Sequence, residues 1–154
     1  MIKTLKSLKL CILAIGLSVP IASHAGVTLT NIFSFNGTNG ALPRTLVRAA
    51  NNKFYGITEN GGPNFTGPEN EDVGGVYSIT SDGVFSNLYF FEGTNGSGGV
   101  YLTPGSDGNF YGTTEDTVFK LNPDGTMANP HLATLPNYSQ ALGLVQDHDG
   151  TLYG

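Results

Sequence analysis

The stretch that decides the fold is residues 105–114, with the sequence GSDGNFYGTT. Its Phe-Tyr-Gly core at 110–112 also occurs at 54–56, and a related Leu-Tyr-Gly occurs at 152–154. Farther out, FNGTNG at 35–40 returns as FEGTNG at 91–96, with the same offset as the two Phe-Tyr-Gly cores. So many coincident landmarks indicate that the chain is built from copies of one repeated unit.

A second pair of landmarks shows that the copies differ in length. GVYSI at 75–79 and the Ser-Asp-Gly that follows match TVFKL at 117–121 and its Pro-Asp-Gly, with a smaller offset than the first pair. The interval from Gly56 to Val76 is much longer than the corresponding interval from Gly112 to Val118. The first copy therefore carries a long Gly-Gly loop that the second copy lacks.

Each copy has the pattern of two β-hairpins. In the first copy, strands at 46–49 and 53–57 flank a turn at 50–52, and strands at 75–80 and 84–91 flank Ser-Asp-Gly. Asn and Asp-Gly turns supply the positive-φ positions that tight hairpins need, and no stretch has a helical period. Because the strands are short and recur, they are typical of β-propeller blades, although a β-sandwich gives similar spacing.

The repetition favours the propeller over the sandwich. We therefore predict an all-β fold, a partial β-propeller-like array of about two and a half four-stranded blades. The copies are expected at about 28–84, 85–126 and 127–154 within a domain spanning 26–154, with the last copy truncated.

Residues 1–25 are predicted to be an export signal. Three lysines and no acid lie in residues 1–9, residues 10–21 are uncharged and mostly apolar, and Ser-His-Ala precedes a cut between Ala25 and Gly26. This apolar core is shorter than the ~20 residues that are needed to cross a bilayer. We expect an exported protein (periplasmic, extracellular or cell surface) with no transmembrane segment in the mature chain.

Charge and cysteine content exclude several classes of function. The whole chain has a net charge of −5, and without the signal four cations face twelve carboxylates, a net charge of −8. This sign argues against nucleic acid and anionic membranes as partners. The one cysteine, Cys11, lies in the signal, so the mature chain has no disulfide, thiolate metal site or cysteine nucleophile.

Residues 75–83, 88–96 and 105–114 resemble the GloVer tandem repeat, which occurs in bacterial exported proteins of the choice-of-anchor kind. The resemblance covers nearly all of residues 27–154, and the block DGNFYGTT is its most specific part. It implies a propeller-like array that is often attached to the cell surface through a C-terminal sorting segment. No activity is established for the family.

Residues that recur in each copy are interpreted as structural. The Tyr-Gly pairs are expected to pack between blades, and the Asp-Gly pairs to form turns. The members are Tyr55, Tyr111 and Tyr153, and Asp82, Asp107, Asp124 and Asp149. The alternative for residues 147–150 is a calcium loop, which requires six or more oxygens. We expect no metal ion and no cofactor.

Function is expected where the copies differ, in the loop at 59–73. Its weak binding candidates are Glu69, Glu71, Asp72 and Phe65, beside Glu59. Paired carboxylates could serve glycoside hydrolysis or contact a metal or ligand, but solvated charge is favoured in a Gly/Pro/Asn-rich loop. No catalytic motif is present, no partner can be assigned to His131 or His148, and no catalytic residue is assigned.

Two functions remain open. The first is a non-catalytic exported or cell-surface repeat module that binds a glycan or a surface protein, or acts as a spacer. The second is an extracellular carbohydrate-active hydrolase or lyase with its site in the propeller channel. A propeller closes with about four to eight blades. We therefore expect either a truncated product of a longer gene or self-association of copies that covers open blade edges.

Overall fold

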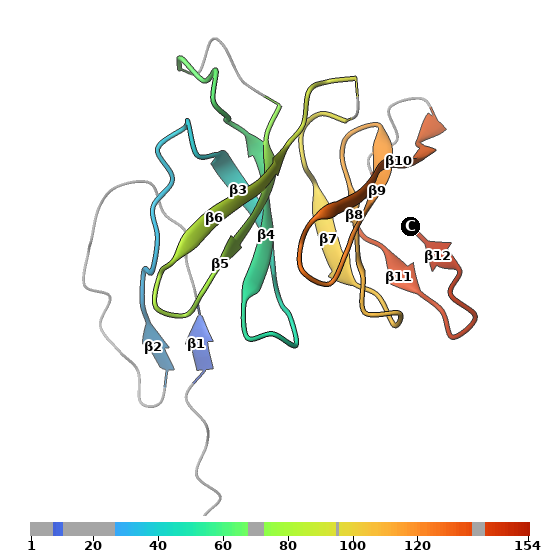
Figure 1. Ribbon diagram of the computed structural model, residues 1–154, viewed down its shortest axis with the longest axis horizontal. Helices are drawn as coiled ribbons and strands as arrows, with labels where there is room; N and C mark the ends of the chain where they lie inside the picture. Colours follow the sequence, from blue (N-terminus) through green and yellow to red (C-terminus); the bar gives the residue numbers. More distant parts are fainter. Residues whose placement is uncertain (1–7, 11–26, 68–72, 95, 137–140) are drawn as a thin grey trace, which may run out of the picture.

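The computed structural model describes residues 8–10, 27–67, 73–94, 96–136 and 141–154. These residues form β-strands joined by turns and loops, without an α-helix among them, and the sheets lie beside one another (Figure 1). The prediction of an all-β protein is confirmed. The expected cleavage residues Ala25 and Gly26 lie outside the described residues, as do the candidates Glu69, Glu71 and Asp72.

The first sheet is an antiparallel meander of four strands in the order in which they follow one another along the chain. The strands are β3 (Ala41–Arg48), β4 (Phe54–Asn60), β5 (Gly75–Ile79) and β6 (Phe85–Phe90). Both predicted hairpins lie in this sheet. Asn52, with φ 63°, forms the first turn, and Gly83, with φ 91°, forms the second.

The second sheet repeats this order, and its first two strands are shorter than those of the first sheet. Its strands are β7 (Tyr101–Pro104), β8 (Phe110–Thr113), β9 (Thr117–Leu121) and β10 (Met127–Thr134). A third sheet is the antiparallel pair β11 (Val145–Gln146) and β12 (Leu152–Tyr153), and a parallel pair joins β1 (Leu8–Leu10) to β2 (Val27–Leu29). None of the sheets closes on itself.

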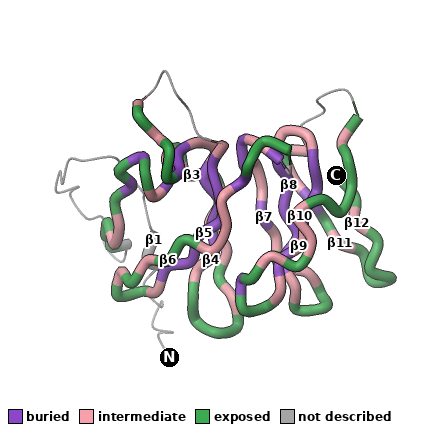
Figure 2. The backbone as a smooth tube through the Cα atoms, turned by 45° about the horizontal axis from the view of Figure 1, so that its top comes forward, coloured by how far each residue is buried: buried purple, intermediate pink, exposed green. Residues whose placement is uncertain are grey.

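These three antiparallel sheets lie side by side, and their buried residues lie mainly on the strands of the first two (Figures 1 and 2). Clusters of apolar side chains lie between successive sheets. Between the first and second sheets lie Tyr55, Ile57, Val76, Phe91, Leu102, Phe110, Phe119 and Leu121. Between the second and third lie Tyr111, Val118 and Leu144, with Leu152 against them. A further cluster on the outward face of the first sheet combines Tyr77 and Ile79 with Ile32, Phe33 and Phe35.

A glycine in the second strand of each four-stranded sheet accommodates an aromatic ring from the third strand. Gly56 pairs with Tyr77, and Gly112 pairs with Phe119. A Cβ on Gly56 would lie 2.2 Å from the Tyr77 ring, and one on Gly112 would lie 2.1 Å from the Phe119 ring. Because no side chain fits at these distances, both positions require glycine.

The phenylalanine that begins FNGTNG, and the one that begins FEGTNG, each contact the third-strand ring that lies over the glycine. Phe35 meets Tyr77 edge to face at 5.1 Å between ring centroids, and Phe91 meets Phe119 at 5.4 Å. All four rings are buried. The stretches FNGTNG and FEGTNG thus hold equivalent places beside the two sheets.

The predicted sequence copies are out of phase with the sheets by one strand. Residues 85–126 supply β6 to the first sheet and β7, β8 and β9 to the second. The segment at 28–35 therefore corresponds to β6. A Cβ on Gly83 would meet the Ile32 carbonyl at 2.8 Å, much as one on Gly125 would meet the Leu88 side chain at 2.7 Å.

Candidate functional site

The long loop of the first copy is tied down at both ends. The Gly62 N–H donates to the Gly37 carbonyl at 3.0 Å, and the Gly74 N–H donates to the Gly61 carbonyl at 3.1 Å. The first bond joins the loop to the FNGTNG turn, and both lie at the upper edge of the first sheet in Figure 1. The insertion is therefore held on a rigid scaffold where it leaves and re-enters the sheet.

Phe65 is the one residue of the four binding candidates that the structure describes. Its ring lies over Gly37, where a Cβ would be only 2.2 Å from ring carbon Cδ1. The Phe65 N–H donates to the Gly62 carbonyl at 3.1 Å, which fixes the backbone below the ring. The ring is half-buried, so one part contacts the turn and another is accessible.

Glu59, at the start of this loop region, forms an ion pair with Arg44 of β3. The Arg44 side chain is 53% exposed and the Glu59 side chain 25% exposed. The pair therefore joins β3 to β4 close to the insertion. Together with Phe65 it places one charge pair and one aromatic ring at this edge.

The opposite edge of the sheets consists of tight turns, several of which are closed by an aspartate and the first by Asn51. The Asp124 carboxylate accepts from the Thr126 N–H at 2.9 Å, and the Asp149 carboxylate accepts from the Thr151 N–H at 2.8 Å. These backbone bonds come first among the causes that lower the pKa of both carboxyls. Both aspartates therefore satisfy turn N–H groups, as the turn interpretation expects.

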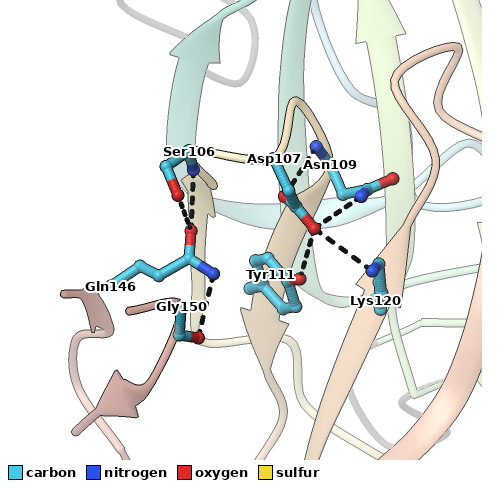
Figure 3. Close-up of polar contacts among 7 residues, drawn as sticks. All are labelled: Ser106, Asp107, Asn109, Tyr111, Lys120, Gln146 and Gly150. Carbon is cyan, nitrogen blue, oxygen red and sulfur yellow. Dashed lines mark hydrogen bonds and ion pairs between the residues drawn. The ribbon is translucent and has the colours of Figure 1, made fainter. Parts of the chain in front are cut away.

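Asp107 is the centre of a larger polar cluster on this edge (Figure 3). Its carboxylate accepts from the Asn109 N–H at 3.1 Å and from the Asn109 side chain at 2.7 Å. It also accepts from the Tyr111 hydroxyl at 2.7 Å and from Lys120 Nζ at 3.3 Å. The ammonium of Lys120 lies 5.3 Å from the centroid of the Tyr111 ring.

The electrostatics of this cluster do not suit acid–base chemistry near neutral pH. Desolvation raises the pKa of Asp107, but hydrogen bonds from Asn109, Tyr111 and Lys120 outweigh it and hold the pKa well below its usual value. Tyr111 and then Asp107 raise the pKa of Lys120. A general acid or base works best with a pKa near the operating pH. Both shifts move away from neutrality, so the cluster favours a structural role.

Gln146 of β11 connects this cluster to the third sheet (Figure 3). Its Oε1 accepts from the Ser106 N–H at 2.7 Å and from the Ser106 hydroxyl at 2.9 Å. Its Nε2 donates to the Gly150 carbonyl at 3.1 Å. Neither Gln146 nor Lys120 was expected from the sequence. Lys120 stands opposite Tyr111 in the strand register, where the first copy has Ser78 opposite Tyr55.

The histidines and the remaining acids do not converge. His131 Nε2 lies 2.8 Å from the Thr134 hydroxyl on β10. The backbone N–H of His148 donates to the Asp147 carboxylate within the last turn. Among the residues that the structure describes, no group of three or more His, Cys, Asp or Glu side chains could hold a metal ion. In the same part of the chain, no helix is long and apolar enough to cross a membrane.

Comparison of the chain with protein-family models, with curated proteins and with solved structures finds no match.

Proposed function

We propose that the chain is a non-catalytic exported repeat module of GloVer-like type. In this proposal its sheets are the blades of a partial β-propeller-like array. Its loops bind a cell-surface glycan, and the principal contact is made by the loop at 61–74.

One observation carries the proposal: the residues that recur are used for packing and turns. Tyr55 lies between sheets with Leu102 and Phe110, and its ring centroid is 4.8 Å from that of Phe110. Tyr111 lies in one cluster with Leu144 and Leu152. Tyr55 and Tyr111 thus each pack between one sheet and the next, which supports an arrangement like that of successive propeller blades. Tyr153, the third tyrosine of the motif, was expected to pack in the same way but is 59% exposed.

Each of these two tyrosines also hydrogen-bonds the turn residue four positions earlier. Asn51 Nδ2 donates to the Tyr55 hydroxyl at 2.8 Å, and the Tyr111 hydroxyl donates to Asp107 at 2.7 Å. A buried phenol needs such a partner. The recurrent polar residues are thereby engaged in the scaffold, which leaves ligand contact to the loop where the copies differ.

Phe65 and the acids near it in the sequence support a glycan as the ligand. An aromatic ring offers an apolar face to a sugar, and carboxylates accept hydrogen bonds from sugar hydroxyls. The half-buried Phe65 ring is fixed on Gly37, so it loses little freedom when a ligand packs on it.

A glycan array tests binding with the purified chain, Phe65→Ala and Leu132→Ala. Leu132 is a control because it is an exposed apolar residue on β10, in the other four-stranded sheet. We expect one glycan class to bind, with affinity about tenfold weaker for Phe65→Ala and unchanged for Leu132→Ala. Cleavage of an arrayed glycan, or no binding by correctly folded protein, would contradict the proposal.

Export is tested separately by N-terminal sequencing of protein collected outside the cytoplasm. A chain that begins at Gly26 is expected. A chain that keeps residues 1–25 in that fraction would contradict the signal peptide.

A further inference from the structure

Equivalent pairs of residues line the two faces of every sheet. On the face toward the preceding sheet, the pairs are Leu46 with Phe54, Leu102 with Phe110, and Leu144 with Leu152. On the face toward the following sheet, the pairs are Val47 with Tyr55, Thr103 with Tyr111, and Val145 with Tyr153, each joined in strand register.

Inside the chain, the tyrosine of each pair lies in one apolar cluster with the leucine pair of the next sheet. Leu102 and Phe110 are 1% and 3% exposed beneath Tyr55. Leu144 is buried in one cluster with Tyr111. The same type of contact therefore occurs twice in the stack, once at each junction between sheets.

On each of the two outer faces of the stack, one of the two residue pairs that form this contact has no partner sheet among the described residues. Val145 and Tyr153 on the third sheet are 70% and 59% exposed. Leu46 and Phe54 on the first sheet are only half-buried, although their counterparts Leu102 and Phe110 are fully buried. In Figure 1, β11 and β12, which carry Val145 and Tyr153, lie to the right of the second sheet, and the first sheet, which carries Leu46 and Phe54, lies to its left.

The segment at 28–35 covers part of the outward face of the first sheet, and Leu46 and Phe54 pack against the same cluster but stay half-buried. Its Ile32, Phe33 and Phe35 pack on the side formed by β5 and β6, where Phe33 stacks on Phe85 at 4.0 Å. The segment corresponds to the fourth strand of a sheet. The side at β3 and β4 is where the first and second strands of a preceding sheet would pack. In the third sheet, β11 and β12 are the strands that correspond to a first and a second strand.

We infer that two copies of this chain associate head to tail. The Val145–Tyr153 face of one copy packs on Leu46 and Phe54 of the next, and repeats the contact of Tyr55 with Phe110. The inference deepens the proposed repeat architecture and rests on it. Because such a contact joins different surfaces, it can continue into a ring or an open stack.

Light scattering on the purified chain from micromolar to near-millimolar concentration tests the contact. The mass is expected to rise above that of one mature chain as the concentration increases. Added salt is expected to strengthen association, because it screens the repulsion between acidic chains and leaves the apolar contact intact.

Two aspartate variants form a matched pair. Val145→Asp is expected to weaken association about tenfold or more, and Leu132→Asp on the outer strand β10 is expected to leave it unchanged. Circular dichroism checks that both variants keep the strand signal. Equal weakening by both variants would overturn the inference.

A cross-link locates the contact. Mature chains with Tyr153→Cys and mature chains with Phe54→Cys, which lack Cys11 because they begin at Gly26, are expected to form a mixed disulfide dimer. Chains with Leu132→Cys are not expected to form one with Phe54→Cys. A single-chain mass at every concentration, in folded protein that still binds its glycan, would overturn the inference but not the proposed function. Absence of glycan binding in protein that still associates would overturn the proposed function but not the inference.

Discussion

Tyr55 and Tyr111 occupy the same position in two successive sheets, but their polar partners differ. Tyr55 is 0% exposed and accepts a hydrogen bond from the neutral Asn51. Tyr111 is 7% exposed and donates to the carboxylate of Asp107. The two positions therefore share the tyrosine ring and its packing between sheets. They differ in the charge of the residue that hydrogen-bonds the tyrosine hydroxyl.

The residue opposite each tyrosine varies together with that partner. Ser78, which is buried, stands opposite Tyr55, and Lys120, which is half-buried, stands opposite Tyr111. The first junction thus keeps charge out of a completely covered site, where an ionised group would be costly. The second junction is covered by the small third sheet and accommodates an ion pair.

The largest expected effect comes from removing the two rings. Tyr55→Ala should lower the free energy of unfolding by about 3–5 kcal/mol, because a large buried aromatic side chain leaves a cavity between two four-stranded sheets. Tyr111→Ala should cost less, because only a two-stranded sheet covers it. Urea denaturation followed by circular dichroism measures both. Equal losses would contradict the difference between the junctions.

The glycines beneath the third-strand rings should come next. Gly112→Ala places a Cβ 2.1 Å from the Phe119 ring and should destabilise the protein by about 1–3 kcal/mol. Gly143→Ala is a suitable control, because a Cβ there meets no atom within 4 Å. If both substitutions had the same effect, the close contact would not explain the glycine.

Removing the charge of Asp107 should have a smaller effect on the free energy of unfolding, and this effect should depend on pH. Asp107→Asn should cost about 1 kcal/mol at pH 7, at the low end for a charge-assisted bond, because the carboxylate is 38% exposed. The folded-state pKa of Asp107 is lowered. Its contribution is therefore fully present above the unfolded pKa of about 3.9 and is lost as the pH falls through the folded value.

The measurement is the free energy of unfolding between neutral pH and strongly acidic pH. The gap between wild type and Asp107→Asn should be widest at neutral pH and should close in acid. A gap that stays constant over this range would show that the carboxylate charge does not matter.

The smallest effect is expected for the ammonium above Tyr111. Lys120→Gln removes a partly exposed ion pair and a cation–π contact, so stability should fall slightly at low salt. The loss should shrink in high salt, because salt screens such pairs. Ser78→Ala is the matched change in the first sheet, and its effect should not depend on salt.

The sequence predicted the strands and turns that depend on local chemistry. The strand at 53–57 lies within β4 apart from its first residue, and the turns at 50–52 and 81–83 lie where expected. The first strand is longer than predicted, because β3 begins at Ala41 and passes through Leu42 at φ 51° and a register shift after Pro43. No local signal marks a positive φ at leucine.

The candidate site was less predictable, because it depends on pairing between strands. The Asp107–Lys120 contact joins the turn between β7 and β8 to strand β9, and it follows only once Tyr111 and Lys120 are known to be opposite each other. Phe65 was named as a loop aromatic, but its position over Gly37 depends on how the insertion folds back.

The offset of one strand between sequence copies and sheets determines where the molecule can be divided. A cut between residues 84 and 85, at the edge of a copy, separates β5 from β6 and opens the first sheet. A cut in the linker between β6 and β7 leaves both meanders whole. Fragments and fusions made from this chain should therefore be joined within residues 91–100, where the polypeptide passes from one set of paired strands to the next.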